Sequence, residues 1–185
     1  MCSGKTHATI GLVGAELVSV ALNSMNLVEF SVADYTTIGI GAVVGSLIVD
    51  IDSKKSKASQ MFNRCLIAFI VMLVASRFVD LSGTNVHLIN LIGNYVKNSF
   101  FAILLIALTV VSHLSPHRMF THKVIGTLAF SILALLTFNL EFAFAFLIGY
   151  VLHLVADGLF TKEDLRFLEI RLPMQDSRGK FHPVI

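Results

Sequence analysis

The stretch YTTIGIGAVVGSLIVDIDSKKSK, residues Tyr35–Lys57, combines an apolar run, two aspartates and a basic segment. Charged side chains are costly inside a bilayer, so this order is typical of a membrane-spanning helix that ends at the water interface. The lysines after the aspartates favour the cytoplasmic side of the membrane. The stretch therefore predicts a transmembrane helix that carries carboxylates at its cytoplasmic end.

The composition of the whole chain also indicates a membrane protein. Of the 185 residues, 55% are hydrophobic and only 14% are charged, whereas soluble domains average about 25% charged residues. The 12 Gly, 3 Pro and 2 Cys exclude collagen-like, disordered and disulfide-rich secreted chains. We therefore expect an all-α fold, a polytopic membrane bundle of about six helices.

Six apolar runs support this number of helices. Three of the runs are near fifteen residues, which at about 1.5 Å per residue gives about 22 Å, less than the roughly 30 Å hydrocarbon core. The short runs must borrow flanking residues, thin the bilayer or stop partway. The segment Val86–Val96 either extends the fourth run or lies in the interface. The six runs are Ala8–Val28, Tyr35–Val49, Cys65–Val79, Phe100–Leu114, Val124–Leu140 and Phe142–Phe160.

The basic residues predict the orientation of the chain. With a cytoplasmic N-terminus and six spans, all of the 14 lysines and arginines except Arg77 and Lys97 fall on the inner side. This distribution follows the positive-inside rule. We expect a multi-pass protein of the inner or plasma membrane, with one membrane-embedded domain over residues 1–160 and a polar tail over residues 161–185. The tail either lies along the membrane surface as an amphipathic lid or is solvated.

Histidines and aspartates gather at one predicted face of the membrane. His153 and Asp157 are four residues apart, so a helix projects both from one face. Asp50 and Asp52 would diverge by about 200° in a regular helix, so both can serve one site only if the helix ends there. The expected cluster consists of His7, Asp50, Asp52, His117, Arg118, His122, His153 and Asp157.

This donor set indicates a metal centre. Four imidazoles and three carboxylates exceed the three protein ligands and open water position of a catalytic zinc, which favours either two ions or one ion with an outer shell of carboxylates. Nitrogen and oxygen donors without thiolates suit Zn²⁺ and also allow Mn²⁺ or Fe²⁺. Such a centre generates hydroxide at neutral pH, and Arg118 would suit a phosphate or carboxylate group of the substrate.

Four motifs in this order resemble the YdjM-type inner-membrane metal-dependent hydrolases, a family described as LexA-regulated and placed near zinc-dependent phospholipase C folds. The resemblance implies metal-dependent hydrolysis at a phospholipase C-like site at one end of the bundle. It also implies a metal shell of His7, Asp50, Asp52, His117, His122, His153 and Asp157. The motifs are GKTHATIG, VDIDSKKS, HRMFTH and GYVLHLVAD.

The turn between the fourth and fifth runs departs from the family's usual H-R-G-x-T-H-S. Met119 replaces Gly, which requires a negative φ at this position. Lys123 replaces Ser and brings an ammonium close to the proposed cations, which should weaken metal binding unless it reaches a phosphate. Pro116 is expected to stop the fourth helix, and Thr121 to cap the fifth with His122 at its first position.

We assign the chemistry to a small set of residues. Asp52, Arg118 and Asp157 are the expected catalytic residues, with one of Asp50, Asp52 and Asp157 as general base and Arg118 steadying the anionic transition state. Membrane lipids are the expected partners, with a phosphorylated or lipid substrate. Nucleic acid is not expected, because no aromatic and basic reading surface is present. The oligomeric state stays open.

Other residues and functions carry weaker signals. His113 lies one turn before His117 and is expected to pack or to support a ligand. Glu16 points about 180° away from His7 on an ideal helix, and Gly41 and Gly45 form a small-x-x-x-small pattern that permits close helix packing. The alternative function is a divalent-metal transporter or sensor that uses the same cluster, with Glu16 as its supporting residue. A third is a catalytically inactive scaffold that anchors to acidic lipid.

Overall fold

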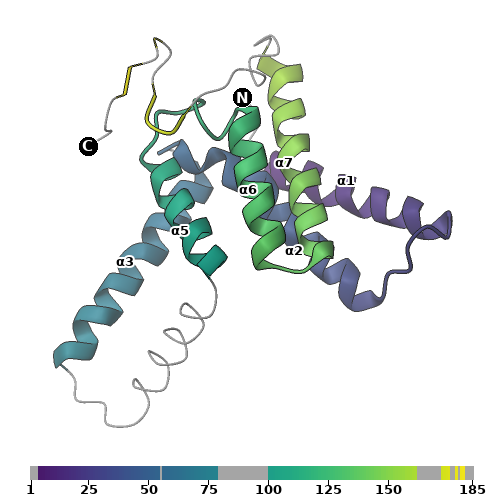
Figure 1. The fold of residues 1–185 in the computed structure, drawn as a ribbon, viewed down its shortest axis with the longest axis horizontal. Coiled ribbons are helices and arrows are strands. Elements are labelled where there is room, and N and C mark those ends of the chain that lie inside the picture. The colour runs from purple at the N-terminus through teal and green to yellow at the C-terminus, as the bar shows by residue number, and fades with distance from the viewer. Residues whose placement is uncertain are drawn as a thin grey trace.

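The computed structural model describes residues 4–54, 56–78, 100–161, 172–175, 178, 180 and 181. These residues form six α-helices and one short 3-10 helix, and no strand longer than the isolated bridge between Gln175 and Phe181. The all-α prediction is therefore confirmed. The elements in chain order are α1 (Gly4–Ser24), α2 (Val32–Ile48), η1 (Val49–Asp52), α3 (Lys57–Phe78), α5 (Phe100–His113), α6 (Val124–Thr137) and α7 (Leu140–Thr161) (Figure 1).

Each of the six apolar runs overlaps one helix, although not each helix has the length of a membrane span. Within the described residues, two segments are long and apolar enough to cross a bilayer, Val32–Asp52 with 21 residues and Leu140–Gly158 with 19. Helices α5 and α6 have 14 residues each, which gives about 21 Å. Six crossings therefore remain a prediction, and the segment Val86–Val96 and most of the tail lie outside the described residues.

Helices α2 and α7 pack closely because glycines lie where they meet. A Cβ atom on Gly45 would overlap the backbone carbonyl of Phe146, and one on Gly149 would overlap the carbonyl of Ala42. The close packing predicted from Gly41 and Gly45 is thus confirmed. In Figure 1 α7 stands beside α6, while α1 and α2 extend to the other side of α7.

An apolar core supports the loop that joins α5 and α6. Phe130 of α6 and Tyr150 of α7 are fully buried and pack with Val49, Phe120 and Phe146 in one cluster. The short helix η1 contacts α2, α3, α5 and α7. Four helices, α2, α3, α5 and α7, therefore meet at η1, directly after the end of α2. The ionisable side chains lie at this junction.

Candidate metal centre

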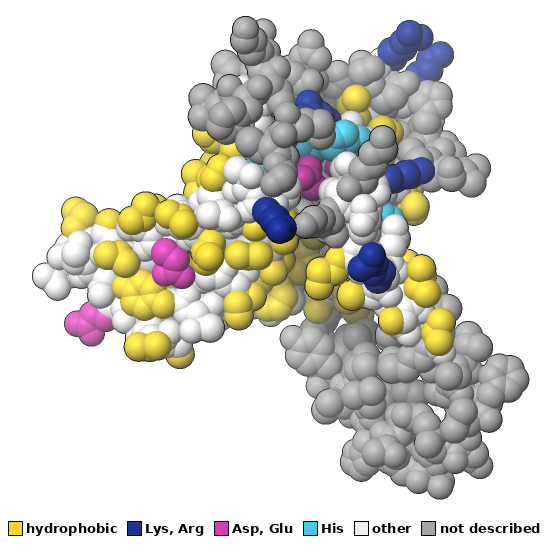
Figure 2. Space-filling view, turned by 180° about the vertical axis from the view of Figure 1, so that it is seen from behind, with side chains coloured by type: hydrophobic (Ala, Val, Ile, Leu, Met, Phe, Trp, Pro, Cys, Tyr) yellow, Lys and Arg dark blue, Asp and Glu magenta, His cyan; other side chains and the backbone are white. Residues whose placement is uncertain are grey.

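Contacts link every residue of the expected cluster to at least one other member, although four separate segments supply them. His7 comes from α1, the two aspartates from η1, and His153 and Asp157 from α7. The turn between α5 and α6 supplies His117, Arg118 and His122. In Figure 2 most of the visible histidine surface forms one patch with acidic and basic side chains beside it, and a smaller histidine surface lies apart from it. The predicted convergence is thus a structural finding, whereas the role of each residue remains a prediction.

Two imidazoles and two carboxylates form the centre of the cluster. His153 Nε2 lies 3.6 Å from Asp50 Oδ1 and 3.8 Å from Asp157 Oδ2. His122 Nε2 lies 3.8 Å from Asp50 Oδ1 and 3.5 Å from Asp157 Oδ2. The expected pairing of His153 with Asp157 across one helical turn is therefore present, and the second histidine faces the same two carboxylates.

These separations fit the ligand sphere of one small divalent cation. Ligands in a tetrahedral zinc site with bonds of about 2.0–2.1 Å lie about 3.3 Å apart, and the four nitrogen-to-oxygen separations in this cluster run from 3.5 to 3.8 Å. The donor atoms of Asp50, His122 and His153 lie mutually within 4.8 Å, and Asp157 Oδ2 lies 3.5 and 3.8 Å from the two ring nitrogens. The residues present therefore fit a Zn²⁺-sized ion.

The hydrogen bonds of two histidines leave a nitrogen lone pair for a cation. His153 Nδ1 lies 2.6 Å from the carbonyl oxygen of Ser46, and a carbonyl only accepts, so Nδ1 must carry the proton. His122 Nδ1 lies 3.1 Å from Thr121 Oγ1, whose hydroxyl donates in turn to Asp52. Within the described structure Nε2 of both rings is buried and has no hydrogen-bond partner. In the neutral form of each ring these hydrogen bonds place the proton on Nδ1 and direct an unprotonated Nε2 into the cluster, as in metal-binding histidines.

Asp52 occupies a different place from the one expected of a ligand. It is 4% exposed, and its Oδ2 accepts hydrogen bonds from the backbone N–H of Arg118 at 2.8 Å and from the Thr121 hydroxyl at 2.9 Å. Its Oδ1 accepts from His117 Nδ1 at 3.0 Å. In the part of the chain that the structure describes, two groups of possible metal ligands have donor atoms mutually within 4.8 Å. The first group is His7, His153 and Asp157, and the second is Asp50, His122 and His153. Neither contains Asp52 or His117, so these contacts favour an orienting role for Asp52.

His7 lies against the other side of Asp157. Its ring stacks on that of His153 with centroids 3.9 Å apart, and its Nε2 lies 3.4 Å from Asp157 Oδ1. Asp157 thus presents one oxygen to His7 and the other to His122 and His153. Because the Nδ1 of His153 is engaged with a carbonyl, His153 has only Nε2 for an ion and cannot complete both donor groups at once.

Arg118 adopts the unusual backbone conformation in the turn. Its φ of 63° lies in the left-handed region, which costs a non-glycine residue about 1–2 kcal/mol, and the hydrogen bond from its N–H to Asp52 offsets this strain. Its Nη2 lies 3.9 Å from Asp157 Oδ2. The described residues with positive φ do not include Met119, as expected, so the irregular position falls one residue before it.

The start of α6 differs from the prediction. Thr121 was expected to cap this helix with His122 at the first position, but the N-cap is Lys123 and the helix begins at Val124. The Thr121 hydroxyl is instead committed to Asp52. A side-chain hydrogen bond to a residue 69 positions earlier in the chain has replaced the local cap that the Thr-His pair suggests.

The carboxylate of Asp52 also changes the acidity of a neighbouring ring. Its hydrogen bond to His117 raises the pKa of that imidazole above the usual value, and burial opposes the change only in part. His117 Nε2 is buried and has no hydrogen-bond partner in the described structure. The ring is therefore held in place through Nδ1, and its centroid lies 5.5 Å from that of the His122 ring.

Sequence reasoning misses the supporting contacts of three residues, Ser46, Tyr150 and Thr121. Ser46 uses its backbone carbonyl, which no side-chain pattern can indicate. The hydroxyl of Tyr150 donates to the carbonyl of Thr121 from a fully buried ring. The sequence predicts Thr121 as a helix cap, whereas the N-cap is Lys123. The motifs HRMFTH and GYVLHLVAD contain Thr121 and Tyr150, so the sequence signal was present although their function was not recognised.

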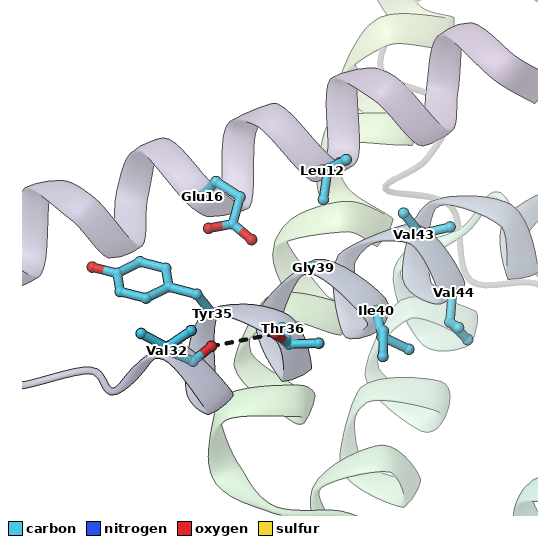
Figure 3. Close-up of a pocket in the computed structure, with 9 residues that line it drawn as sticks. All are labelled: Leu12, Glu16, Val32, Tyr35, Thr36, Gly39, Ile40, Val43 and Val44. Atoms are coloured by element: carbon cyan, nitrogen blue, oxygen red, sulfur yellow. Dashed lines mark hydrogen bonds between the residues drawn. The ribbon is translucent and has the colours of Figure 1, made fainter.

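Glu16 lies apart from the cluster. It lines a groove of about 600 Å³ between α1 and α2 together with apolar side chains and Tyr35. Figure 3 shows its carboxylate pointing from α1 toward α2 near Gly39. The described residues contain no other histidine or acidic side chain in the lining of this groove. The sequence-based expectation that Glu16 does not share a metal with His7 agrees with this arrangement.

The fold and the cluster together define a class of protein, an all-helical membrane protein with a buried histidine and aspartate centre at the ends of its apolar helices. The chain belongs to the YdjM inner membrane protein family, whose model matches residues 1–181. The resemblance drawn from the four motifs is therefore confirmed at the level of the family. No curated protein and no solved structure matches the chain.

Proposed function

We propose that this protein is a membrane-embedded, metal-dependent hydrolase that cleaves a phosphoester of a lipid or of another phosphorylated substrate at the membrane. The single observation that carries the proposal is the arrangement of His122 and His153, whose buried Nε2 atoms have no hydrogen-bond partner among the described residues and face the carboxylates of Asp50 and Asp157. Buried donor atoms without hydrogen-bond partners are costly. A cation that accepts their lone pairs removes this cost.

The proposed ligands are Asp50, His122 and His153, whose donor atoms lie mutually within 4.8 Å, together with Asp157, whose Oδ2 lies within 3.8 Å of both ring nitrogens. Mixed nitrogen and oxygen donors suit Zn²⁺ and are compatible with Mn²⁺ or Fe²⁺. We favour one tightly held ion, because His153 can complete only one of the two donor groups and a second ion would have His7 and one oxygen of Asp157 as its nearest donors. A divalent ion supplies Lewis acidity and makes water nucleophilic at neutral pH.

The remaining side chains support this chemistry. Asp52 is buried and accepts three hydrogen bonds, so its expected part as general base passes more naturally to Asp157, which is less buried. In this reading Asp52 fixes His117 directly and His122 through Thr121. Arg118 contributes positive charge beside Asp157 and would bind the oxygens of an anionic substrate.

The proposed location of the centre is the cytoplasmic side of a multi-pass protein. Lys5 at the start of α1, Lys54 after η1 and Lys123 before α6 all lie close in sequence to residues of the cluster. A concentration of basic side chains at one end of apolar helices is typical of the cytoplasmic face. It also suits contact with anionic lipid headgroups, which supports a substrate at the membrane surface.

A divalent-cation transporter that uses the same cluster is the second candidate. Glu16, an acidic residue between two apolar helices, is the observation in its favour. Glu16 lies nine residues after His7, about 13 Å along the helix axis, so an ion would have to leave the cluster to reach it. Transporters usually place their ion ligands in broken helices near mid-membrane, which favours the hydrolase.

The full chain, purified in detergent, stripped with a chelator and reloaded, tests the proposal. Bound metal is measured by mass spectrometry, and turnover is measured with phosphomonoesters, phosphodiesters and phospholipid vesicles. We expect one tightly bound ion and metal-dependent hydrolysis in the natural protein and in Glu16→Gln, a carboxylate change outside the cluster. His153→Ala should lose both.

Each contrary result has a distinct meaning. A natural protein that binds no divalent ion above background would remove the metal centre. Bound metal without hydrolysis of any phosphoester, together with Glu16-dependent metal uptake in proteoliposomes, would replace the hydrolase with the transporter.

A further inference from the structure

His113, the last residue of α5, belongs to neither group of metal-facing donor atoms. Its Nδ1 lies 2.8 Å from the backbone carbonyl of Ile51. Because a carbonyl only accepts, the ring must carry its proton on Nδ1 and donate it to Ile51. The hydroxyl of Ser59 lies 3.4 Å from the same nitrogen, and the Phe62 ring packs against the imidazole with centroids 5.2 Å apart. The ring is therefore held between η1 and α3.

The carbonyl that His113 contacts lies between the two aspartates of the cluster. Ile51 is the third residue of η1, with Asp50 before it and Asp52 after it. A 3-10 helix has poorer hydrogen-bond geometry than an α-helix and rarely extends beyond one turn, so such a segment depends on contacts from outside to keep its conformation. A rotation of the Ile51 peptide would move both neighbouring carboxylates.

His117, four residues after His113, also holds η1. His117 donates to the side chain of Asp52 at 3.0 Å, while His113 donates to the backbone of Ile51 at 2.8 Å. The end of α5 and the turn after it thus fix η1 at two points. His122 follows on the same turn, and its Nε2 lies 3.8 Å from Asp50 Oδ1.

We propose that His113 is a positioning residue of the metal centre, which aims Asp50 and Asp52 through the backbone of η1 without touching the ion. The inference rests on the proposed metal binding. It assigns a function to a histidine whose direct contacts are only a carbonyl, a hydroxyl and an aromatic ring.

Asparagine and glutamine at position 113 provide a matched test of the donor. In His113→Asn the amide nitrogen lies near the place of Nδ1 and can donate to Ile51, whereas in His113→Gln the amide extends past it. Outer-shell partners of metal ligands contribute about 10–100-fold to affinity. We expect His113→Gln to weaken zinc binding by about that factor and His113→Asn to stay within a few-fold of the natural protein.

The readouts are zinc affinity by chelator competition, the visible spectrum of the Co²⁺-loaded protein, and helical circular dichroism before metal is added. His113→Gln should change the cobalt spectrum and keep the helical signal, and His113→Asn should restore the natural spectrum. If Gln prevents folding, His113→Leu, which fills the space without a donor, takes its place.

Two results would overturn the inference while leaving the proposed function intact. One is an unchanged zinc affinity and cobalt spectrum in His113→Gln, and the other is an equal loss in the asparagine and glutamine variants, which would show that packing and not the donated proton matters. Absence of metal in the natural protein would overturn the proposed function first, and this inference with it.

Discussion

The metal-facing cluster and the Glu16 groove both place carboxylates among apolar helices, yet they differ in what surrounds the carboxylate. In the cluster, Asp157 faces ring nitrogens of His7, His122 and His153 at 3.4–3.8 Å. In the groove, Glu16 faces mainly apolar side chains, Tyr35 and Thr36. An acidic residue in an apolar helix is thus not by itself a sign of a cation site.

The two regions differ in whether neighbouring groups fix the orientation and tautomer of metal-binding side chains. In the cluster, a carbonyl fixes the tautomer of His153 and a hydroxyl that of His122, so that lone pairs converge. Asp52 also helps to orient these side chains, because it accepts hydrogen bonds from His117, the Arg118 N–H and Thr121. Among the described residues that line the groove there is no such imidazole. We expect this contrast to govern metal binding.

The largest loss is expected for His153→Ala. The substitution removes the nitrogen that both donor groups share, so metal affinity should fall well beyond the about 10–100-fold cost of losing an outer-shell partner. Metal content after dialysis against a weak chelator measures the effect. Retention of a full equivalent of metal in a folded variant would show that other residues bind the ion.

Asp52→Asn should give an intermediate loss. The amide keeps the shape of the carboxylate but brings a donor NH₂ toward groups that themselves donate, and it removes the charge that His117 and Thr121 contact. We expect about a 10–100-fold weaker affinity for zinc, which is the range for orienting residues. Chelator competition measures it, with His153→Ala as the reference.

The size of this loss also separates two roles for Asp52. A variant as completely devoid of metal as His153→Ala would return Asp52 to the ligand set implied by the family resemblance. An affinity equal to that of the natural protein would deny it any part in the centre.

Much of the fold and the membership of the site could be predicted from sequence, because both depend on local periodicity and on residue type. Apolar runs predict helices, and the four-residue spacing of His153 and Asp157 predicts a shared face, as the structure confirms. The end of a regular helix before Asp50, inferred from the charges that follow it, is also present, since α2 ends at Ile48.

What the sequence left open depends on contacts between distant segments. The Thr121 hydroxyl and the Arg118 N–H reach Asp52 across 69 and 66 residues, and His113 reaches Ile51 across 62. Local preference favoured Thr121 as a helix cap, and tertiary packing gave its hydroxyl another partner. Hydrogen bonds to backbone carbonyls, such as that of Ser46, have no side-chain pattern at all.

Tyr150→Phe should have a smaller effect on the metal centre than Asp52→Asn. Its hydroxyl donates to the carbonyl of Thr121 in a fully buried setting, and removal leaves that carbonyl without this donor at a cost of about 1–3 kcal/mol. The loss should appear mainly as a lower unfolding temperature, with metal affinity reduced only a few-fold because His122 is displaced indirectly. Thermal unfolding with and without zinc separates the two effects, and an unchanged unfolding temperature would contradict the assigned contact.

The smallest effect is expected for Glu16→Gln. The carboxylate lies in the groove between α1 and α2 and not in the cluster, and the amide preserves its size, so zinc affinity should stay within about twofold of the natural value. Zinc competition and uptake of zinc into proteoliposomes should both be measured on the same preparation. A loss of affinity comparable to that of His153→Ala would mean that the groove and the cluster form one cation path. The two regions would then be successive ion sites of a transporter.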